Sequence, residues 1–376
     1  MHVAVICRAL GGSGSVAAVA LRQARELARH FRVTLISESF PDETPWASAR
    51  LLVTLRDLNV LRRFRHVPDD YMFARASGRA LLELQARDPL DFMLAHAHSV
   101  AWFGMQPLAS RHRVPYGFFV HGDIFERPRG TYDARLTAFY RWVTPRAYRA
   151  APVVFSLSET MGRGIRTRGA PRIEVVPNGI DPSDIGLGPP VQPSPRSPGE
   201  PLRILNVGRL SLEKGIDHLL DACALLSVDY RLDIAGGGPL EHQLRGRIDS
   251  LGLKPAVRLL GLVERSRMGA LYSSYDVFCT PALNEPFALV ILEALASGLP
   301  VIGTRVDGIP EVVKHEENGL LVGPADPSAL AEAITRLAED ETLRLQLASR
   351  SVASVLPRYE WRAIGDQIAD VIRRMA

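Results

Sequence analysis

A stretch dense in proline, serine and glycine divides the sequence into two parts that share one internal pattern. It reads DPSDIGLGPPVQPSPRSPGEP, residues 181–201. Such a composition cannot sustain a helix or a central strand, so we expect a linker over 183–200. On both sides, short apolar runs alternate with segments of helical periodicity. In a chain of 376 residues this pattern predicts two domains rather than one.

The part before the linker begins like a doubly wound sheet. An apolar run over 3–7 precedes a glycine-rich loop over 11–15, a helical pattern over 16–30 and a second apolar run over 32–37. Strand, glycine loop, helix and strand in that order are typical of a parallel sheet covered by helices. Further strands are expected over 91–97, 116–122, 151–158 and 173–179. The first domain is therefore predicted over 1–182.

The part after the linker repeats the alternation, and a second domain is predicted over 201–358. Strands are expected over 202–208, 230–236, 257–263, 276–282, 300–304 and 319–323. Helices are expected near 214–227, 238–251, 264–274, 286–298, 327–352 and 359–375. The predicted fold class is α/β, with two Rossmann-like doubly wound domains facing across a cleft. Ligands of such sheets bind beyond the carboxyl ends of the strands, so the cleft is the expected binding site.

Basic residues are concentrated in the first half of the chain. Residues 1–190 contain 25 Arg and Lys against 17 Asp and Glu, whereas residues 191–376 contain 20 against 24. This asymmetry indicates that the first domain faces an anionic membrane surface or a phosphorylated substrate, or simply has a solvated arginine-rich surface. Because no zinc knuckle, RNP-like aromatic motif or basic-region helix is present, no nucleic-acid partner is expected.

The cysteines and the hydropathy favour a cytoplasmic protein. Cys7, Cys223 and Cys279 lie far apart in apolar stretches without a metal-type spacing, as expected of buried free thiols in a reducing compartment. The apolar N-terminal run is short and lacks the charged region of a signal peptide. No apolar run approaches the roughly 20 residues that span a bilayer.

Two glutamates interrupt the apolar run NEPFALVILEALASGLPVIGT, residues 284–304. Pro286 fits the first position of a helix that Gly298 ends. That helix is apolar nearly all round and hence buried, so Glu293 needs a hydrogen-bond donor from the protein or from a ligand. Glu285 and Glu293 would lie roughly 12 Å apart along a helix, too far for a glycosidase pair. We interpret them as two contacts to one elongated ligand, with the helix N-terminus as a phosphate site between them.

A second candidate site is the loop NVGRLSLEKG, residues 206–215, which follows an expected strand. It contains Arg209 and Lys214, and two such cations could neutralise a diphosphate without a metal ion. Ordinary surface charge is the alternative. Since the chain has only three lysines, a lysine beside a glycine at position 214 is more suggestive of a site than a lysine usually is.

Several motifs together resemble the retaining glycosyltransferases of family four, which have the two-domain GT-B fold. The motifs are PNGID (177–181), GRLSLEKG (208–215), AGGGPLEHQL (235–244), VRLLGLV (257–263), the glutamate–seven residues–glutamate pattern within 284–304, and GIPEVV (308–313). The resemblance covers nearly all of the second domain and only loosely the first. It also implies that the last helix, about 359–376, crosses back onto the first domain.

The resemblance implies a role for each candidate residue. Glu293 would hold the ribose hydroxyls of a nucleotide-sugar donor, Glu285 the sugar hydroxyls, and Arg209 and Lys214 the diphosphate. His121, in FFVHGD, matches a histidine that contacts the donor sugar near the reacting carbon, although on the residues alone it is equally a structural histidine at a strand end. His121, Arg209, Lys214 and Glu285 would form the catalytic set. Further donor contacts are implied for Gly12, Ser13, Val263, Phe287, Ala288 and Leu289.

Two residues depart from the family's motifs in the second domain. Ala288 stands where the family usually has glycine, and Gly237 stands where an acidic residue is common.

The acceptor side is less defined. A basic amphipathic segment over 50–65 could dock on anionic lipid or receive a phosphorylated acceptor, or could be a surface helix that packs its leucines on the sheet. A sugar, a glycolipid or a phosphorylated small molecule is therefore expected as the acceptor, with a peripheral contact to the inner face of an anionic membrane.

The resemblance implies a retaining hexosyltransferase of glycan or glycolipid biosynthesis that uses a UDP- or GDP-sugar. No metal ion and no cofactor are expected, because no suitable loop contains an aspartate pair such as D-x-D. One alternative is a nucleotide-sugar epimerase on the same scaffold. Another is an NAD-dependent dehydrogenase, since Gly12, Gly14 and Ala17 satisfy G-x-G-x-x-A and Glu38 follows the second strand. A non-catalytic nucleotide-sugar binding protein is a third.

Overall fold

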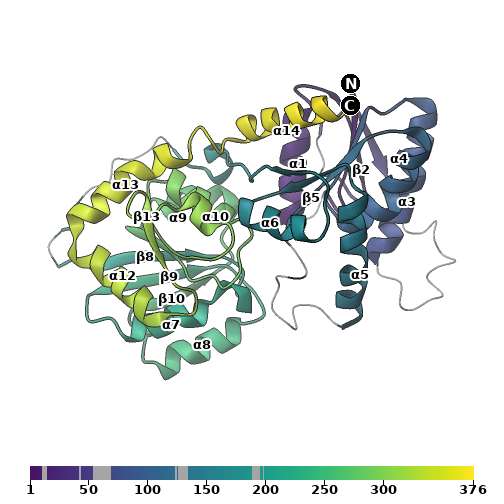
Figure 1. Cartoon of the computed structure of the whole chain (residues 1–376). Coiled ribbons are helices and arrows are strands. Elements are labelled where there is room, and N and C mark those ends of the chain that lie inside the picture. Colours follow the sequence, from purple (N-terminus) through teal and green to yellow (C-terminus); the bar gives the residue numbers. More distant parts are fainter. Residues whose placement is uncertain are drawn as a thin grey trace. The chain divides into compact units, whose positions relative to one another are not determined.

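The computed structural model describes residues 1–10, 15–41, 44–53, 69–122, 125, 134–188, 195–197 and 199–376. These divide into two compact units. The N-terminal unit comprises Met1–Asn178 with Trp361–Ala376, and the C-terminal unit comprises Gly179–Glu360. Each unit is a parallel sheet with helices on both faces (Figure 1), so the predicted α/β class with two Rossmann-like domains is confirmed.

The sheet of the N-terminal unit has seven parallel strands in the order β3-β2-β1-β4-β5-β6-β7. The strands are β1 (His2–Ile6), β2 (Arg32–Ser37), β3 (Ala49–Leu52), β4 (Phe92–Ala95), β5 (Tyr116–Val120), β6 (Val153–Ser156) and β7 (Ile173–Val175). Every residue of β1, β4, β5 and β6 is buried. Helices cover both faces of these strands, which explains why they are continuous apolar runs in the sequence.

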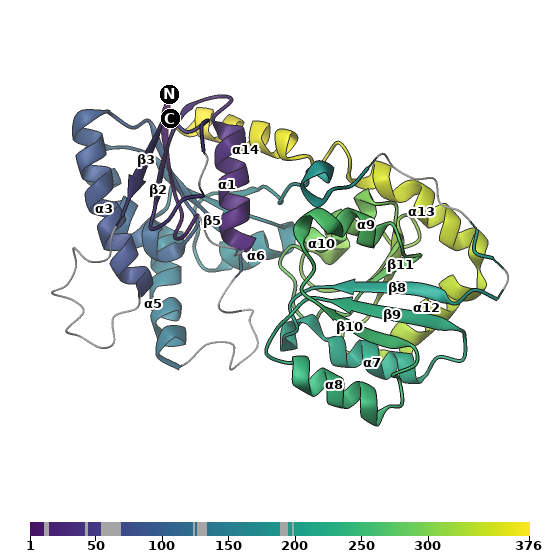
Figure 2. The same cartoon turned by 180° about the vertical axis from the view of Figure 1, so that it is seen from behind.

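Helices α1 and α14 lie side by side on one face of this sheet, and α3 and α5 cover the other (Figure 2), with α4 packed beside α3 (Figure 1). The helices are α1 (Ser15–Leu27), α3 (Asp69–Arg87), α4 (Gln106–His112), α5 (Ala134–Ala150), α6 (Glu159–Thr167) and α14 (Trp361–Met375), with a π-helical turn at Val100–Met105 before α4. Large side chains such as Phe73, Phe118 and Tyr148 fill the core between the sheet and the helices α3, α4 and α5.

The sheet of the C-terminal unit has six parallel strands in the order β10-β9-β8-β11-β12-β13. They are β8 (Leu202–Val207), β9 (Tyr230–Ala235), β10 (Val257–Gly261), β11 (Val277–Thr280), β12 (Val301–Thr304) and β13 (Gly319–Val322). Its helices are α7 (Ile216–Ala224), α8 (Glu241–Ser250), α9 (Met268–Tyr272), α10 (Leu289–Ala296), α11 (Ile309–Val312), α12 (Pro327–Glu339) and α13 (Glu341–Val355). Helix α12 packs on α7, and α13 packs on α10.

Three elements differ from the sequence-based expectations. Residues 49–52 form the edge strand β3 rather than the start of a helix; residues 54–65 of the basic segment lie outside the described residues. The helix expected over 327–352 is two helices, because Asp340 ends α12 and its side chain accepts a hydrogen bond from the N–H of Leu343 at the start of α13. Helix α10 begins at Leu289, so Pro286 is not its first residue. None of the described helices is long and apolar enough to cross a bilayer.

Helix α14 is fixed to α1 at close range. A Cβ added at Gly365 would lie 2.3 Å from the Cβ of Glu26, so the two backbones approach closely only because position 365 is glycine. The His30 ring, at the end of α1, adds a polar contact. It bonds the Asp366 carboxylate at 2.7 Å, and its other nitrogen accepts from Arg373 at 3.0 Å. The C-terminal helix is thus an integral part of the N-terminal unit.

We predict that Gly365→Ala destabilises the N-terminal unit by about 1–3 kcal/mol, since the new methyl group must displace Glu26 or the helix. Gly246→Ala is the matched control, because this exposed glycine of α8 has no atom within 4 Å of an added Cβ. That variant should gain roughly 0.5–1 kcal/mol in helix propensity. Thermal unfolding followed by calorimetry measures both. Equal shifts for the two variants would contradict the close contact.

Candidate functional site

Three loops of the C-terminal unit meet at the carboxyl ends of β8, β11 and β12. The carbonyl of Glu213 accepts hydrogen bonds from the N–H groups of Leu283 at 2.9 Å and Asn284 at 3.2 Å. The N–H of Gly308 donates to the carbonyl of Glu285 at 3.3 Å. These bonds link the loop after β8, the segment before α10 and the loop after β12. Parallel sheets bind their ligands at this edge.

Lys214 and Glu285 are in direct contact within this group of loops. The Nζ of Lys214 donates to Oε2 of Glu285, whose side chain is 9% exposed. Gly215 allows the approach, since its φ is +60° and an added Cβ would lie 2.3 Å from the carbonyl oxygen of Pro281. The structure therefore brings together two of the residues assigned to the donor from the sequence.

Asp307 holds the segment that carries Glu285. Its Oδ2 accepts hydrogen bonds from the Glu285 N–H at 2.7 Å and from the side-chain amide of Asn284 at 2.8 Å. Residues 285–288 are therefore held ahead of the helix instead of forming its first turn. Ala288, the N-cap residue, has extended backbone angles of φ −86° and ψ 101°. Pro286 suits this segment as well as it suits a helix start, which is why the sequence misplaced the start of α10.

The N-terminus of α10 leaves backbone donors available. Among the described residues, the N–H groups of Phe287, Ala288 and Leu289 have no hydrogen-bond acceptor, and no side chain caps the helix. Unpaired amides and the positive end of the helix dipole favour an anion at this position. Ala288 has ordinary backbone angles for an L-residue, so its replacement of the family's glycine creates no strain there.

Glu293 lies inside α10, is 4% exposed and has two protein donors. Arg265 Nη1 donates to one carboxylate oxygen at 3.1 Å, and the Tyr272 hydroxyl donates to the other at 2.9 Å. Burial raises the pKa of Glu293, and Arg265 and Tyr272 only partly offset that rise. Burial, with the carboxylate beside it, also raises the pKa of Tyr272 well above its usual value. Because a carboxylate has about four acceptor positions, Glu293 can still accept bonds from a ligand.

The remaining donor-site candidates of this unit lie on the same edge. Arg209 is exposed, and within the described chain its side chain has no ion pair or hydrogen bond. It lies close enough to Glu213 to help lower the pKa of that carboxyl, which burial alone would raise. Val263 is half-buried just after β10. Among the described residues, Arg209 is therefore an unpaired cation on the same edge as the Lys214–Glu285 contact.

In the N-terminal unit, two histidines follow neighbouring strands. His121 follows β5 and His96 follows β4, and Nδ1 of His96 lies 3.0 Å from Nε2 of His121. Burial, and then the nearby His98, lower the pKa of His121 to about 4. Gly12 and Ser13 lie outside the described residues, so the structure does not bear on their predicted roles.

The dehydrogenase interpretation needs Glu38 as a ribose ligand, but the carboxylate of Glu38 already forms an ion pair within the protein. Its Oε2 accepts a hydrogen bond from Arg8 Nε at 3.0 Å, and Arg8 also donates to Asp70 at 2.8 Å. These hydrogen bonds outweigh the effect of burial and raise the pKa of Arg8. A ribose would have to compete with this ion pair for Glu38.

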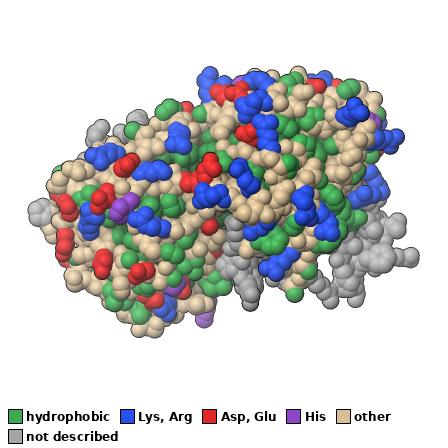
Figure 3. All heavy atoms as spheres, viewed as in Figure 1, with side chains coloured by type: hydrophobic (Ala, Val, Ile, Leu, Met, Phe, Trp, Pro, Cys, Tyr) green, Lys and Arg blue, Asp and Glu red, His purple; other side chains and the backbone are tan. Residues whose placement is uncertain are grey.

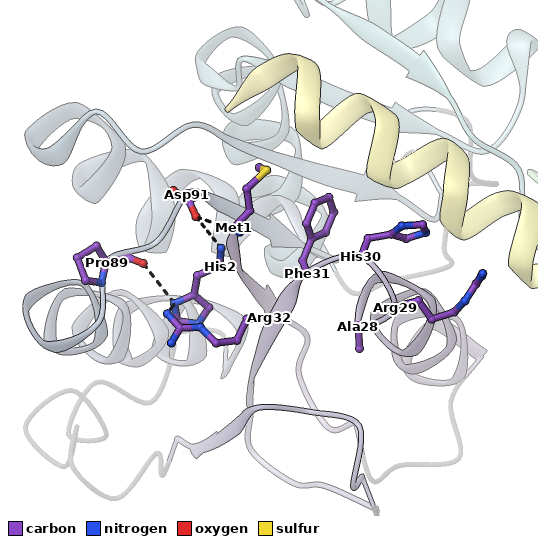
Figure 4. Close-up of a pocket in the computed structure, with 9 residues that line it drawn as sticks. All are labelled: Met1, His2, Ala28, Arg29, His30, Phe31, Arg32, Pro89 and Asp91. Atoms are coloured by element: carbon purple, nitrogen blue, oxygen red, sulfur yellow. Dashed lines mark hydrogen bonds and ion pairs between the residues drawn. The ribbon is translucent and has the colours of Figure 1, made fainter.

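A cavity of about 500 Å³ opens at the opposite end of the N-terminal sheet (Figure 4), lined by Met1, His2, Ala28, Arg29, His30, Phe31, Arg32, Pro89 and Asp91. It lies at the amino ends of β1 and β2. Its cations are paired: Arg29 with Glu26 at 3.0 Å, His30 with Asp366, and Arg32 with Asp88. These cations are already neutralised by carboxylates, and the cavity lies at the amino ends of the strands, so it is a poor binding site for an anion. We therefore do not assign the nucleotide-sugar donor to this cavity. Among the described residues, no cluster of His, Cys, Asp and Glu could hold a metal ion.

Sequence reasoning missed four residues that contact the predicted ones, namely His96, Arg265, Tyr272 and Asp307. His96 and Asp307 each follow a strand, so their position at a carboxyl edge was a usable signal. Arg265 and Tyr272 reach Glu293 only through the packing of the helical segment 265–272 on α10, and local sequence has no signal for that contact.

Two family models match consecutive parts of the chain. The model described as glycosyltransferase family 4 matches residues 14–184, and that of glycosyl transferases group 1 matches residues 191–352. An uncharacterized glycosyltransferase of Methanocaldococcus jannaschii is 30% identical over 272 residues, which are 69% of this chain and 70% of that protein. Other curated relatives are matched over about half of their length.

Two solved structures share the fold over the whole chain. Sucrose-phosphate synthase from Thermosynechococcus elongatus has a TM-score of 0.81 and 21% identity, with 100% of this chain and 98% of that one covered. Anabaena HepE in complex with UDP-glucose has a TM-score of 0.76 and 21% identity, with both chains covered completely. The GT-B fold expected from the motifs is confirmed by the two parallel sheets and these likenesses. The chain belongs to the glycosyltransferases.

Proposed function

We propose that this protein transfers a sugar from a nucleoside-diphosphate sugar to an acceptor hydroxyl, with retention of configuration and without a metal ion or cofactor. The observation that carries the proposal is the contact of Lys214 with Glu285 beside the uncapped N-terminus of α10. It combines a cation, a carboxylate and free backbone amides at the carboxyl edge of a parallel sheet. A nucleotide sugar needs these groups, because it joins an anionic diphosphate to hydroxyl-rich ends.

The diphosphate is assigned to Arg209, Lys214 and the α10 amides. Arg209 is exposed and unpaired among the described side chains, so a phosphate would not have to displace a protein partner from it. Lys214 has three N–H donors, and its bond to Glu285 leaves two for phosphate oxygens. The amides of Phe287, Ala288 and Leu289 add neutral donors at the start of α10.

The two glutamates are assigned to the ends of the donor. Glu285, next to Lys214, accepts bonds from the sugar hydroxyls, and Glu293, deeper in α10, accepts bonds from the ribose hydroxyls. Val263 contacts the nucleoside side, and Gly12, Ser13 and His121 supply the contacts of the N-terminal unit. The UDP-glucose complex of a protein with the same fold supports this class of donor.

The chemical step breaks the bond between the anomeric carbon and the diphosphate oxygen. Its electron pair leaves with the phosphate, where Arg209, Lys214 and the helix N-terminus stabilise the added charge. The acceptor oxygen attacks the same face of the sugar, and the departing phosphate takes the acceptor's proton. This cationic environment supports a reaction without a metal ion.

A donor screen tests the proposal. Purified protein is incubated with UDP-, GDP- and ADP-sugars in EDTA, and release of the nucleoside diphosphate is measured. We expect hydrolysis of one donor class, undiminished by EDTA, and faster turnover when an acceptor is added. Loss of turnover on chelation, restored by magnesium or manganese, would contradict metal independence. Conversion of the donor to an epimer, or binding of NADH with no response to any nucleotide sugar, would replace the proposal with one of the alternatives.

Retention of configuration is read from the same reaction. Proton NMR of the first product formed reports the coupling constant of the anomeric proton, which distinguishes the two anomers. A product with the donor's anomeric configuration is expected, and an inverted product would reject same-face attack.

The variant Glu293→Gln is expected to change nucleotide affinity and folding stability in opposite directions. Because the folded pKa of Glu293 is raised above its ordinary 4.5, the folded state binds more protons than the unfolded state above that pH. The stability contributed by this carboxyl is therefore present below pH 4.5 and is lost as pH rises through the folded pKa. Relative to wild type, the Gln variant should gain stability as pH rises from 4.5 to 8, while its affinity for the nucleotide falls on the order of 10-fold.

The readouts are urea unfolding at several pH values and calorimetric titration with the nucleotide. Exposed Glu264, just before Arg265, provides the matched control, and Glu264→Gln should change neither quantity. If the Glu293→Gln variant binds the nucleotide as tightly as wild type, the assignment of Glu293 to the ribose hydroxyls is rejected.

We also propose a cytoplasmic location with a peripheral contact to an anionic membrane through the N-terminal unit. Support comes from α5, where Trp142 is 46% exposed and the Arg146 guanidinium lies 4.3 Å from its ring centroid. Tryptophan next to arginine suits the interface of an anionic bilayer. On the face drawn in Figure 3, Lys and Arg side chains are more frequent than Asp and Glu over this unit. The buried free thiols of Cys7, Cys223 and Cys279 fit a reducing compartment.

Co-sedimentation with vesicles tests the membrane contact. We expect wild type to bind phosphatidylglycerol vesicles at low salt and to dissociate at high salt, with binding reduced by Trp142→Ala. Leu225→Ala, which removes a 60% exposed apolar side chain from the C-terminal unit, is the control. If wild type stays in the supernatant at low salt, the membrane contact is rejected.

A further inference from the structure

His96 and His121 form a stacked, hydrogen-bonded pair at the carboxyl edge of the N-terminal sheet. Their ring centroids lie 5.2 Å apart with an interplanar angle of 21°, and Nδ1 of His96 is 3.0 Å from Nε2 of His121. The Phe119 ring lies beside both histidines: its centroid is 5.4 Å from that of His96, with an interplanar angle of 5°, and 6.1 Å from that of His121. The strands β4 and β5 pair in parallel immediately before the two histidines, so the sheet itself fixes their spacing.

The surroundings of His96 determine which nitrogen carries its proton. His96 is 6% exposed, and its Nε2 is buried with no hydrogen-bond partner in the described structure. A proton on Nε2 would bury an unsatisfied N–H donor, which native proteins avoid more strictly than an unsatisfied acceptor. The proton therefore belongs on Nδ1 of His96, which donates to Nε2 of His121. With Nε2 acting as the acceptor, a neutral His121 must carry its own proton on Nδ1.

Both rings are neutral near neutral pH. Burial, followed by the proximity of His121, lowers the pKa of His96 well below its usual value. The His98 ring, whose Nε2 lies 3.3 Å from the Tyr148 hydroxyl, is the neighbouring titratable group that further lowers the pKa of His121. A neutral pair removes the repulsion that two imidazolium ions would have at this distance.

We propose that His96 is a positioning residue that holds His121 in the Nδ1–H tautomer, so that His121 offers a hydrogen-bond donor, and not a basic nitrogen, to an oxygen of the nucleotide sugar. The choice of tautomer sets what a histidine can do, because the proton on one ring nitrogen is fixed by the bond that the other nitrogen makes. His121 would then orient a hydroxyl or phosphate oxygen and would not remove a proton from the acceptor. This role of His121 rests on the proposed function, whereas its tautomer does not.

Nitrogen NMR of selectively labelled histidine tests the tautomer directly. His121→Asn assigns the signals of His121 in the full-length protein. We expect its Nε2 to be the unprotonated nitrogen in wild type and in His96→Asn, since the asparagine amide places an N–H donor near the position of Nδ1. His96→Leu, which has nearly the shape of asparagine but no donor, should lose this preference.

Kinetics with the accepted donor test the consequence. His96→Leu should lower kcat on the order of 10-fold with KM little changed, as is usual when the partner that orients a functional histidine is removed, while His96→Asn stays close to wild type. In the His121→Ala background, His96→Leu should cause no further loss, because His96 acts through His121. Calorimetric unfolding of each variant checks that the fold is retained.

Two results would overturn the inference. One is a wild-type His121 protonated on Nε2, and the other is an equal loss of kcat in His96→Leu with and without His121. If the chain accepts no nucleotide sugar, the proposed function fails but the wild-type NMR spectrum still decides the tautomer. The wild-type spectrum also decides it if His96→Leu does not fold.

Discussion

The site depends on one ion pair, the contact of Lys214 with Glu285, and three loops cooperate to form it. Gly215 brings the lysine loop against the carbonyl oxygen of Pro281, where any Cβ would clash. Asp307 holds the backbone of Glu285 outside the helix that follows it. The resulting pair lies beside unpaired amides at the start of α10. Without this arrangement, the lysine would be one more surface cation and the glutamate a costly buried charge.

The buried carboxylate of Glu293 lowers the stability of the folded protein. Burial raises its pKa even though Arg265 and Tyr272 both donate to it, so the carboxylate destabilises the folded state near neutral pH relative to a neutral side chain. Proteins tolerate such groups chiefly at functional sites. The same reasoning applies to His96: within the described residues its buried Nε2 has no partner, and its ring bonds His121, a candidate site residue, through Nδ1. In both units, the costly polar group lies at or next to a residue assigned to the donor.

The sequence predicted the central strands because helices cover both faces of each sheet, which makes those strands continuous apolar runs. It missed residues 49–52, which read ARLL and form an edge strand that is largely exposed, so neither alternation nor a long buried run marks them as a strand. It misplaced the start of α10, because Pro286 suits both conformations and the choice is made by Asp307, which is distant in the chain. The burial of Glu293 followed from the composition around it, but its partners did not. His96 was missed because pairing with His121 depends on strand order, which periodicity does not specify.

The assignment of the diphosphate to Lys214 is tested most directly by calorimetric titration of a nucleoside diphosphate in EDTA. Lys254, which is 71% exposed and paired with Asp249 at 3.0 Å, provides the control. Lys254→Met should bind UDP or GDP like wild type. Lys214→Met should bind it about 10- to 100-fold more weakly, the loss expected for hydrogen bonds from a charged donor. Equal affinity in wild type and Lys214→Met would contradict the account of the site.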